Sequence, residues 1–386
     1  QLATLESQQG NLKKALGIIE KALVKNQHHL KARVLQVALS RHLNQPVADF
    51  IQENLQMDQL DLGTLYERSL ENQDQTQWLK AMRQEVNNYL ELAADYLDYG
   101  LLKEALAILK AAPESPLVGY YQAYIYQLLG DDSSVQQAIN KAEASVSDYC
   151  FPNKLVDQRV LEFVIQANPN TGYAKYYLGN LLYDKQQFTR AIALWEEASV
   201  ALPTFATVLR NLAFAAYNKQ DDVAQAFDYI QRAISLDPND ARLLLEQEQL
   251  ASRQGVAIDK RIQILEKTPE TTAFRDALFV EYITLLNSQG KYEEAYQRIM
   301  GRQFHPWEGG EGKISGQFEY ALIEMAKDCL TENPQQAILY LEESFVYPEN
   351  LGEGKLPSVN DNLTYYYLGK AYEQLGEVRT AQTYFE

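Results

Sequence analysis

A short pattern of small and aromatic residues recurs along the chain and limits what it can fold into. In its clearest copy, Leu178 and Gly179 are followed by Phe188, then by Trp195 flanked by alanines, and finally by Pro203. Small residues at this spacing fit where two antiparallel helices cross closely, and large residues fill the gaps beside them. Proline then ends the second helix. Each copy is therefore expected to form a helix-turn-helix pair.

The same frame recurs at a period of about 34 residues, although several copies are degenerate. Glycine is expected to supply the turn between the two helices at Gly100, Gly130, Gly290 and Gly376. The spacing resembles that of tetratricopeptide repeats, which stack so that neighbouring units bury a shared core. We therefore predict an all-α fold, an α-α superhelix or tetratricopeptide solenoid of about eleven helix-turn-helix units.

Departures from the frame suggest a division of the chain. The predicted parts are 1–148, with partly degenerate units; 149–170, an irregular single-helix joint; 171–304, with regular units; and 305–386, with long glycine-rich loops between repeats. The frame places Gln1 inside a first helix and Glu386 inside a second one. We therefore expect the chain to be a piece of a longer protein.

Charge and cysteine content narrow the classes of partner. The formal net charge of −17 disfavours nucleic acid and anionic membranes, because no basic block offsets the acids. Cys150 and Cys329 have no metal-ligand spacing around them, which argues against a disulfide framework and a structural zinc, and fits a reducing compartment. No apolar run approaches the roughly 18 to 20 residues that span a bilayer. We predict a cytoplasmic protein without a metal.

The first helix of each pair is expected to present a binding face, as it does in tetratricopeptide arrays. In the clearest units this face carries Tyr173, Tyr176, Asn180, Tyr183, Arg210, Phe214 and Tyr217. Tyrosine offers a large contact area with a polar tip, which suits recognition of a peptide or a protein domain. The alternative, left open here, is that several rings pack between neighbouring helices. Glu246 and Glu248 in the next unit argue against a clamp for a terminal carboxylate.

The stretch HPWEGGEGK, at 305–313, interrupts the helical pattern, and its GEGK recurs at 352–355. Both copies follow the second helix of a unit, so stacking is expected to bring them to the same edge of the array. Lys313 is followed by Ile314 instead of Ser or Thr, which excludes a phosphate-binding P-loop. The glycines of GEGKISG are also spaced wrongly for a dinucleotide fingerprint.

Two interpretations of these loops remain open. In the first, Trp307 stacks on a sugar or peptide beside Glu308, Glu311 and Glu353, and His305 serves as a base or a ligand. The paired carboxylates of a glycosidase need a fixed separation, which nothing in the sequence sets. In the second interpretation the glycines take positive φ angles to turn the chain, and Trp307 fills a gap between repeats.

Longer phrases resemble one particular family. The run YCFPNKLVDQRVLEFVIQANPNTGYAKYYLGNLLYDKQQFTRAIALWEEA, with RNLAFAAYN, FHPWEGGEGK and YPENLGEGKL, is similar to the C-terminal half of large bacterial proteins of unknown function. In that family a β-rich domain, similar to sugar-binding mutarotase-like folds, precedes a tetratricopeptide array. The resemblance extends from about Tyr89 onward and more loosely before it. It implies a link to carbohydrate metabolism through the preceding domain.

The expected function is that of a non-catalytic scaffold without a cofactor. Its expected partner is a protein or a peptide, or the β-rich N-terminal domain of its own longer chain. The alternative is an accessory part of a carbohydrate-binding or carbohydrate-active site formed together with that domain, in which case a carbohydrate is reached through the full-length protein.

Overall fold

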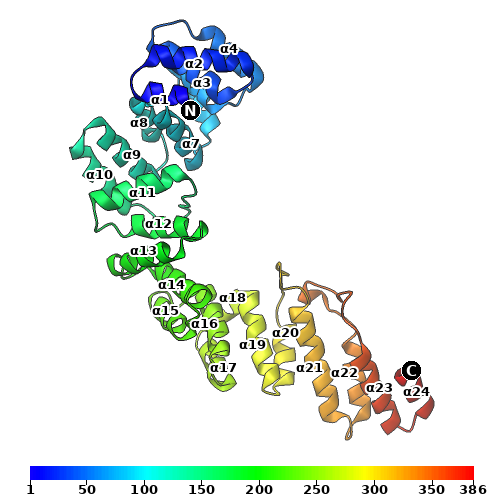
Figure 1. The fold of residues 1–386 in the computed structure, drawn as a ribbon. Coiled ribbons are helices and arrows are strands. Elements are labelled where there is room, and N and C mark those ends of the chain that lie inside the picture. Colours follow the sequence, from blue (N-terminus) through cyan, green and yellow to red (C-terminus); the bar gives the residue numbers. More distant parts are fainter. The chain divides into compact units, whose positions relative to one another are not determined.

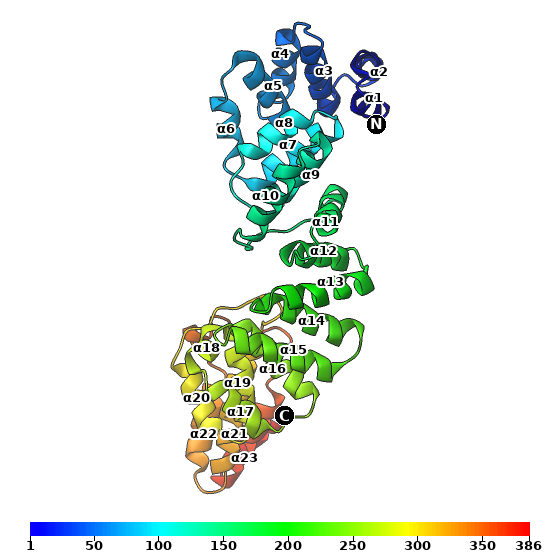
Figure 2. The same ribbon diagram turned by 90° about the vertical axis from the view of Figure 1, so that its left-hand side faces the viewer.

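The computed structural model describes residues 1–386 and consists of α-helices, one short 3-10 helix and connecting loops. It divides into two compact units, Gln1–Pro203 (unit 1) and Thr204–Glu386 (unit 2). Within each unit, the two helices of every helix-turn-helix pair lie side by side, as Figure 1 and Figure 2 show. The predicted all-α solenoid of stacked helix pairs is confirmed. No helix is both long enough and apolar enough to cross a bilayer.

Unit 1 contains six helix pairs and the single helix α11. Its helices are α1 (Leu2–Gln8), α2 (Leu12–Lys25), α3 (Leu30–His42), α4 (Ala48–Met57), α5 (Leu62–Asn72), α6 (Thr76–Met82), α7 (Val86–Asp98), α8 (Leu102–Lys110), α9 (Pro116–Leu129), α10 (Asp132–Glu143), α11 (Leu155–Ala167), α12 (Tyr173–Asp184) and α13 (Phe188–Ala201).

Unit 2 contains five helix pairs and the single helix α18. Its elements are α14 (Ala206–Lys219), α15 (Val223–Leu236), α16 (Ala241–Arg253), α17 (Ile258–Glu266), α18 (Pro269–Phe274), α19 (Asp276–Ser288), α20 (Tyr292–Met300), α21 (Lys313–Cys329), α22 (Pro334–Glu343), the 3-10 helix η1 (Glu349–Leu351), α23 (Asn362–Gln374) and α24 (Val378–Phe385). The two units together hold eleven pairs, as predicted.

The crossing of α12 and α13 shows why the repeat needs its small residues. A Cβ atom on Gly179 would lie 2.5 Å from Cδ1 of Trp195, so only glycine lets the indole pack this closely. The indole Nε1 of Trp195 donates a hydrogen bond of 3.0 Å to Oδ1 of Asn180. The close crossing predicted for this unit is confirmed.

The turns inside the pairs use left-handed backbone. Gly100 and Gly290 have φ angles of 76° and 78°, a region that glycine enters without steric cost. In the pair α12 and α13, where the frame has no glycine, Gln186 takes this conformation with φ of 61°. The predicted turn glycines therefore have the conformation that the turn requires.

A carboxylate links α10 to α12 in the region of the single helix α11. Glu143, the last residue of α10, accepts hydrogen bonds from the backbone amides of Gly172 (2.9 Å), Tyr173 (3.1 Å) and Ala174 (3.0 Å). These amides begin α12, where no earlier turn supplies acceptors and the helix dipole favours negative charge. Glu143 thereby caps α12 and fixes its position against α10.

A largely buried ionic network joins three repeats of unit 1. Arg41 of α3 bonds to Glu67 of α5 (2.8 Å) and to Glu104 of α8 (3.1 Å). His42 bonds to the same Glu104 carboxylate at 2.6 Å, and Tyr96 donates its hydroxyl to Glu67 at 2.5 Å. Burial opposes ionisation of Glu104, but its hydrogen bonds with His42 and Arg41 outweigh burial and lower its pKa to about 2.

Candidate functional site

A groove of about 850 Å³ in unit 2, called the helix groove below, is lined mainly by α14, α16 and α19. Its aromatic and polar lining comprises Phe214, Tyr217, Asn218, Glu246, Glu248, Gln249, Arg253 and Glu281. Phe214 keeps 49% of its surface exposed. The helices that line the groove are the first members of their pairs, as expected for a binding face.

Two ion pairs fix the wall of the helix groove. Arg210 donates from Nε to both carboxylate oxygens of Glu246, at 2.8 and 3.0 Å, and Arg261 donates to Glu248 at 2.9 Å. Burial raises the pKa of Glu248, and the nearby charge of Glu281 adds to this effect. The carboxylate of Glu281 itself makes no hydrogen bond or ion pair within the chain, so it is available to a ligand.

Two of the predicted binding residues of unit 2, Phe214 and Tyr217, line the helix groove, and Arg210 holds the lining residue Glu246. The signal that found them was the repeat frame, which identified the exposed face of α14. Glu281 and Gln249 were missed because they lie on other helices, α19 and α16, whose frames are less regular. The binding roles of Phe214, Tyr217 and Arg210 stay predictions.

Two of the four predicted residues of unit 1, Tyr183 and Asn180, contact the neighbouring helix α13 through Trp195. Tyr183 stacks on the indole of Trp195, with ring centroids 5.0 Å apart. Tyr173 and Tyr176 both contact the ring of Tyr177, at centroid distances of 6.3 and 5.3 Å. Asn180 accepts the hydrogen bond from the Trp195 indole described above. All four predicted residues are half-buried. Tyr183 and Asn180 make contacts of the kind expected for packing between helices, whereas Tyr173 and Tyr176 contact a ring of their own helix, α12. The binding roles of all four residues stay predictions.

The two GEGK loops meet, as predicted. Glu353 of the second loop accepts hydrogen bonds from the Gly312 amide (2.9 Å) and from the amide and hydroxyl of Ser315 (3.2 and 2.8 Å). Gly312 is the N-cap of α21, so the carboxylate caps that helix from a loop about one repeat later. The amide of Phe304 also donates to Asn350 O at 2.8 Å. We call this joined pair of segments, 301–312 and 345–361, the loop clasp.

Glycine is required at two contacts of the loop clasp. Gly352 has φ of 71°, and a Cβ atom there would lie 2.5 Å from the carbonyl oxygen of Phe304. Gly310 lies against Trp307, where a Cβ atom would come within 2.1 Å of the indole. The turn-making interpretation therefore explains Gly352, while Trp307 is only partly buried and keeps accessible surface.

A second groove of unit 2, about 720 Å³ in volume, lies beside the loop clasp and is called the loop groove. Its lining includes Asn239, Asp240, Arg242, Phe274, Arg275, Asp276, Arg302, His305 and Trp307. Figure 1 shows α18 and the loops that follow α20 and α22 at one end of the neighbouring helices. The groove thus unites the predicted residues His305 and Trp307 with residues of α16 and α18.

Sequence reasoning missed Phe274 and Arg275 because α18 does not belong to the repeat frame. The helix is a short single one between α17 and α19, so the period gives no position to its side chains. The available local signal was Pro269, which begins the helix in the sequence TPETTAFRD. That signal predicts a helix start but not a groove.

The predicted glutamates do not gather around Trp307. Glu308 and Glu311 are exposed and do not line the loop groove. Glu353 uses both oxygens to cap α21. The arrangement therefore gives Glu353 a role in holding the loop clasp, and none of the three predicted glutamates lines the groove that contains Trp307.

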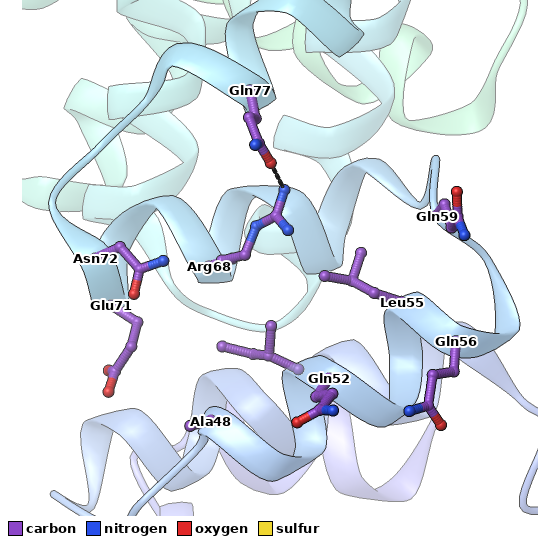
Figure 3. Close-up of a pocket in the computed structure, with 10 residues that line it drawn as sticks. Ala48, Gln52, Leu55, Gln56, Gln59, Arg68, Glu71, Asn72 and Gln77 are labelled. Atoms are coloured by element: carbon purple, nitrogen blue, oxygen red, sulfur yellow. Dashed lines mark hydrogen bonds between the residues drawn. The ribbon is translucent and has the colours of Figure 1, made fainter.

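Unit 1 has a groove rich in amide side chains, shown in Figure 3. It has a volume of about 610 Å³ between α4, α5 and α6. Its lining includes Gln52, Leu55, Gln56, Gln59, Arg68, Glu71, Asn72 and Gln77. Arg68 donates a hydrogen bond to Gln77, marked by the dashed line in Figure 3. No aromatic side chain lines this groove.

No protein-family model matches the chain. Among solved structures it is similar to MamA, residue 41 to the end, from Desulfovibrio magneticus RS-1, with 21% identity over 50% of this chain and 97% of that chain, at a TM-score of 0.30. For PilF of Pseudomonas aeruginosa the identity is 17% over 56% and 89% of the two chains, with a TM-score of 0.34. YrrB, described as a TPR protein with an unusual peptide-binding site, is 14% identical over 58% and 95%, with a TM-score of 0.23.

Proposed function

We propose that this chain is a non-catalytic scaffold that binds an extended segment of a partner protein in the helix groove. The observation that carries the proposal is the half-exposed ring of Phe214, which lies with Tyr217 in the same groove as the unpaired carboxylate of Glu281. Aromatic and charged side chains that lie together often contribute most of the binding energy of a protein interface.

At Glu281 the helix groove suits a lysine or arginine side chain of the bound segment, while Arg253 lines the same groove as a cation. The ring of Phe214 can cover the methylene stem of such a side chain, and Glu281 can receive its charge. Gln249 is exposed and offers both a donor and an acceptor to a peptide backbone. At low ionic strength, where charges are little screened, the net charge of −17 also attracts cationic partners.

The ion pairs of the helix groove favour a binding function over a catalytic one. Arg210 and Arg261 neutralise Glu246 and Glu248 within the chain. These pairs hold the wall in place and leave Glu281 as the carboxylate open to a partner. Such a wall is preformed, so little ordering is required when a partner binds.

A fluorescence polarisation titration tests the proposal, with the full chain and a labelled peptide of alternating lysine and leucine. We expect the peptide to bind the wild type. Phe214→Ala and Glu281→Lys should each lower the affinity about 10-fold, as replacement of an energetically important interface residue typically does. The matched controls are Leu339→Ala and Glu332→Lys, two exposed positions elsewhere in unit 2, and they should leave the affinity unchanged. Equal affinities for the groove variants and their controls would refute the assignment.

A further inference from the structure

The loop groove differs from the helix groove in the charge of its lining. Three arginines, Arg242, Arg275 and Arg302, line the groove together with only two acids, Asp240 and Asp276. Both acids are already paired, Asp240 with Arg242 at 3.0 Å and Asp276 with Arg302. The guanidinium of Arg275 makes no hydrogen bond or ion pair within the chain. The groove therefore has a cationic excess on a chain that is acidic overall.

Apolar surface accompanies this charge. Phe274, the last residue of α18, is 87% exposed, and Trp307 is partly exposed in the same groove. A phenylalanine exposed to this extent does not gain the favourable free energy of burial. Phenylalanine, tryptophan and arginine together are the residue types enriched at the energetic centres of protein interfaces.

The groove is held in place by contacts to both of its sides. Arg302, a residue of the loop clasp, donates a hydrogen bond of 2.8 Å to the carbonyl oxygen of Ala273 and forms an ion pair with Asp276. These contacts join the loop clasp to the connection between α18 and α19. Its guanidinium also lies over the rings of Phe279 and Phe304, at 4.4 and 4.8 Å. The amide of His305 donates to the same Asp276 at 2.8 Å. Arg302, Asp276 and the backbone of His305 are thus held in place at the groove before any ligand binds.

We propose that the loop groove is a second binding site, which takes an acidic peptide segment containing an aromatic or large aliphatic side chain. Arg275 receives a carboxylate of the peptide, and the apolar side chain lies between Phe274 and Trp307. Screening limits the repulsion from the rest of the chain to about 8 Å at physiological ionic strength, so the local arginines decide the interaction. This site is separate from the helix groove and takes ligands of opposite charge.

Tryptophan fluorescence gives a direct readout of this site. The chain contains three tryptophans, and two of them, Trp78 and Trp195, are only 1% and 3% exposed. The emission that acrylamide quenches in the folded chain therefore comes mainly from Trp307. A ligand in the loop groove should protect this emission from quenching.

The experiment titrates the full chain with a peptide of alternating glutamate and phenylalanine and follows acrylamide quenching and polarisation of a labelled copy. We expect the bound peptide to protect Trp307 from acrylamide quenching, and the affinity to fall with added salt. Phe274→Ala and Arg275→Glu should each lower the affinity about 10-fold. Phe151→Ala and Arg379→Glu are matched controls at exposed positions outside the groove. Because Phe274 and Arg275 are exposed, circular dichroism should show these variants folded as the wild type.

Three outcomes would overturn the proposal. The first is that the acidic peptide does not bind, or that its affinity is the same for the groove variants and the control variants. The second is protection of Trp307 by the lysine and leucine peptide instead. The third is protection by a neutral oligosaccharide with no response to acidic peptide, which would make the groove a sugar site. Phe214→Ala should leave acidic-peptide binding unchanged, so failure here is distinguishable from failure of the helix-groove proposal.

Discussion

Glu353 and Ser315 are joined by two hydrogen bonds, from the serine amide at 3.2 Å and from its hydroxyl at 2.8 Å to the same carboxylate oxygen. The other oxygen accepts from the Gly312 amide at 2.9 Å. A carboxylate from the second glycine loop therefore supplies the N-terminal cap that α21 does not receive from its own N-cap, Gly312. The loop that follows α22 thus stabilises the beginning of α21.

Replacing Glu353 with alanine should destabilise unit 2. The change leaves the first amides of α21 without a protein acceptor and removes a charge that favours the positive end of the helix dipole. Loss of such a cap costs about 1 to 2 kcal/mol. Urea unfolding followed by circular dichroism measures the effect.

Glu311→Ala is the control for this change, because Glu311 is an exposed glutamate of the first glycine loop with no partner within the chain. It should alter the unfolding free energy by less than about 0.5 kcal/mol. Indistinguishable unfolding midpoints for the Glu353 and Glu311 variants would contradict the capping role.

Two glycines of the second loop should respond differently to alanine. Gly352 has a positive φ of 71° and faces the Phe304 carbonyl, so Gly352→Ala should destabilise the protein by about 1 to 3 kcal/mol. A Cβ atom on Gly354 would meet nothing within 4 Å, so Gly354→Ala should be nearly neutral. Denaturant midpoints of the two variants decide the matter, and equal midpoints would show that Gly352 is replaceable.

Opposite signs are expected for alanine at two helical glycines of unit 1. Gly179→Ala places a methyl group 2.5 Å from the Trp195 indole, and overpacking of this kind costs about 1 to 3 kcal/mol. Gly17→Ala, in α2 with open space around it, should raise stability by about 0.5 to 1 kcal/mol. Thermal unfolding of both variants provides the comparison. A Gly179 variant as stable as the wild type would mean that the crossing tolerates a side chain.

The ionic network of unit 1 should make stability depend on pH. The pKa of Glu104 is lowered to about 2 in the fold, against a value of 4.5 for a free glutamate, so its contribution is complete above pH 4.5 and is lost as the pH falls toward 2. A shift from 4.5 to about 2, at about 1.4 kcal/mol per pKa unit, predicts that the unfolding free energies of the wild type and Glu104→Gln differ by on the order of 3 kcal/mol above pH 4.5.

Urea unfolding at several pH values, from neutral to about pH 2, checks this dependence for the wild type and the Glu104 variant. The difference between them should shrink steadily over the acid range. Glu20→Gln, an exposed change on α2, should show no such trend. A difference that is constant with pH would mean that the network does not hold Glu104 ionised.

The sequence predicted the repeat architecture well because its signals are local. The spacing from Gly179 to Trp195 reflects one helix crossing, and Gly100 and Gly290 sit at turns that need left-handed backbone. The repetition of GEGK was enough to predict that the two loops meet, because stacked repeats bring equivalent loops together. Each of these features depends on residues within one repeat or on its immediate copy.

The details of the grooves were not predictable in the same way. The hydrogen bond between Glu353 and Ser315 joins residues far apart in the sequence, and no local pattern predicts that they pair. The helix α18, which carries Phe274, lies outside the repeat period. Tyr183 could equally have faced a ligand or packed on Trp195, because an amphipathic side chain suits both environments. Such choices depend on which neighbours the complete fold brings within reach.

Photo-crosslinking tests the central claim, binding in the helix groove, most directly. A peptide of alternating lysine and leucine that carries a benzophenone group is irradiated with the full chain, and the attachment sites are mapped by mass spectrometry. The account predicts attachment to α14 around Phe214 and Tyr217 and to α16 around Gln249, with loss of labelling in Glu281→Lys. Labelling that is spread over both units, or that persists unchanged in Glu281→Lys, would contradict it.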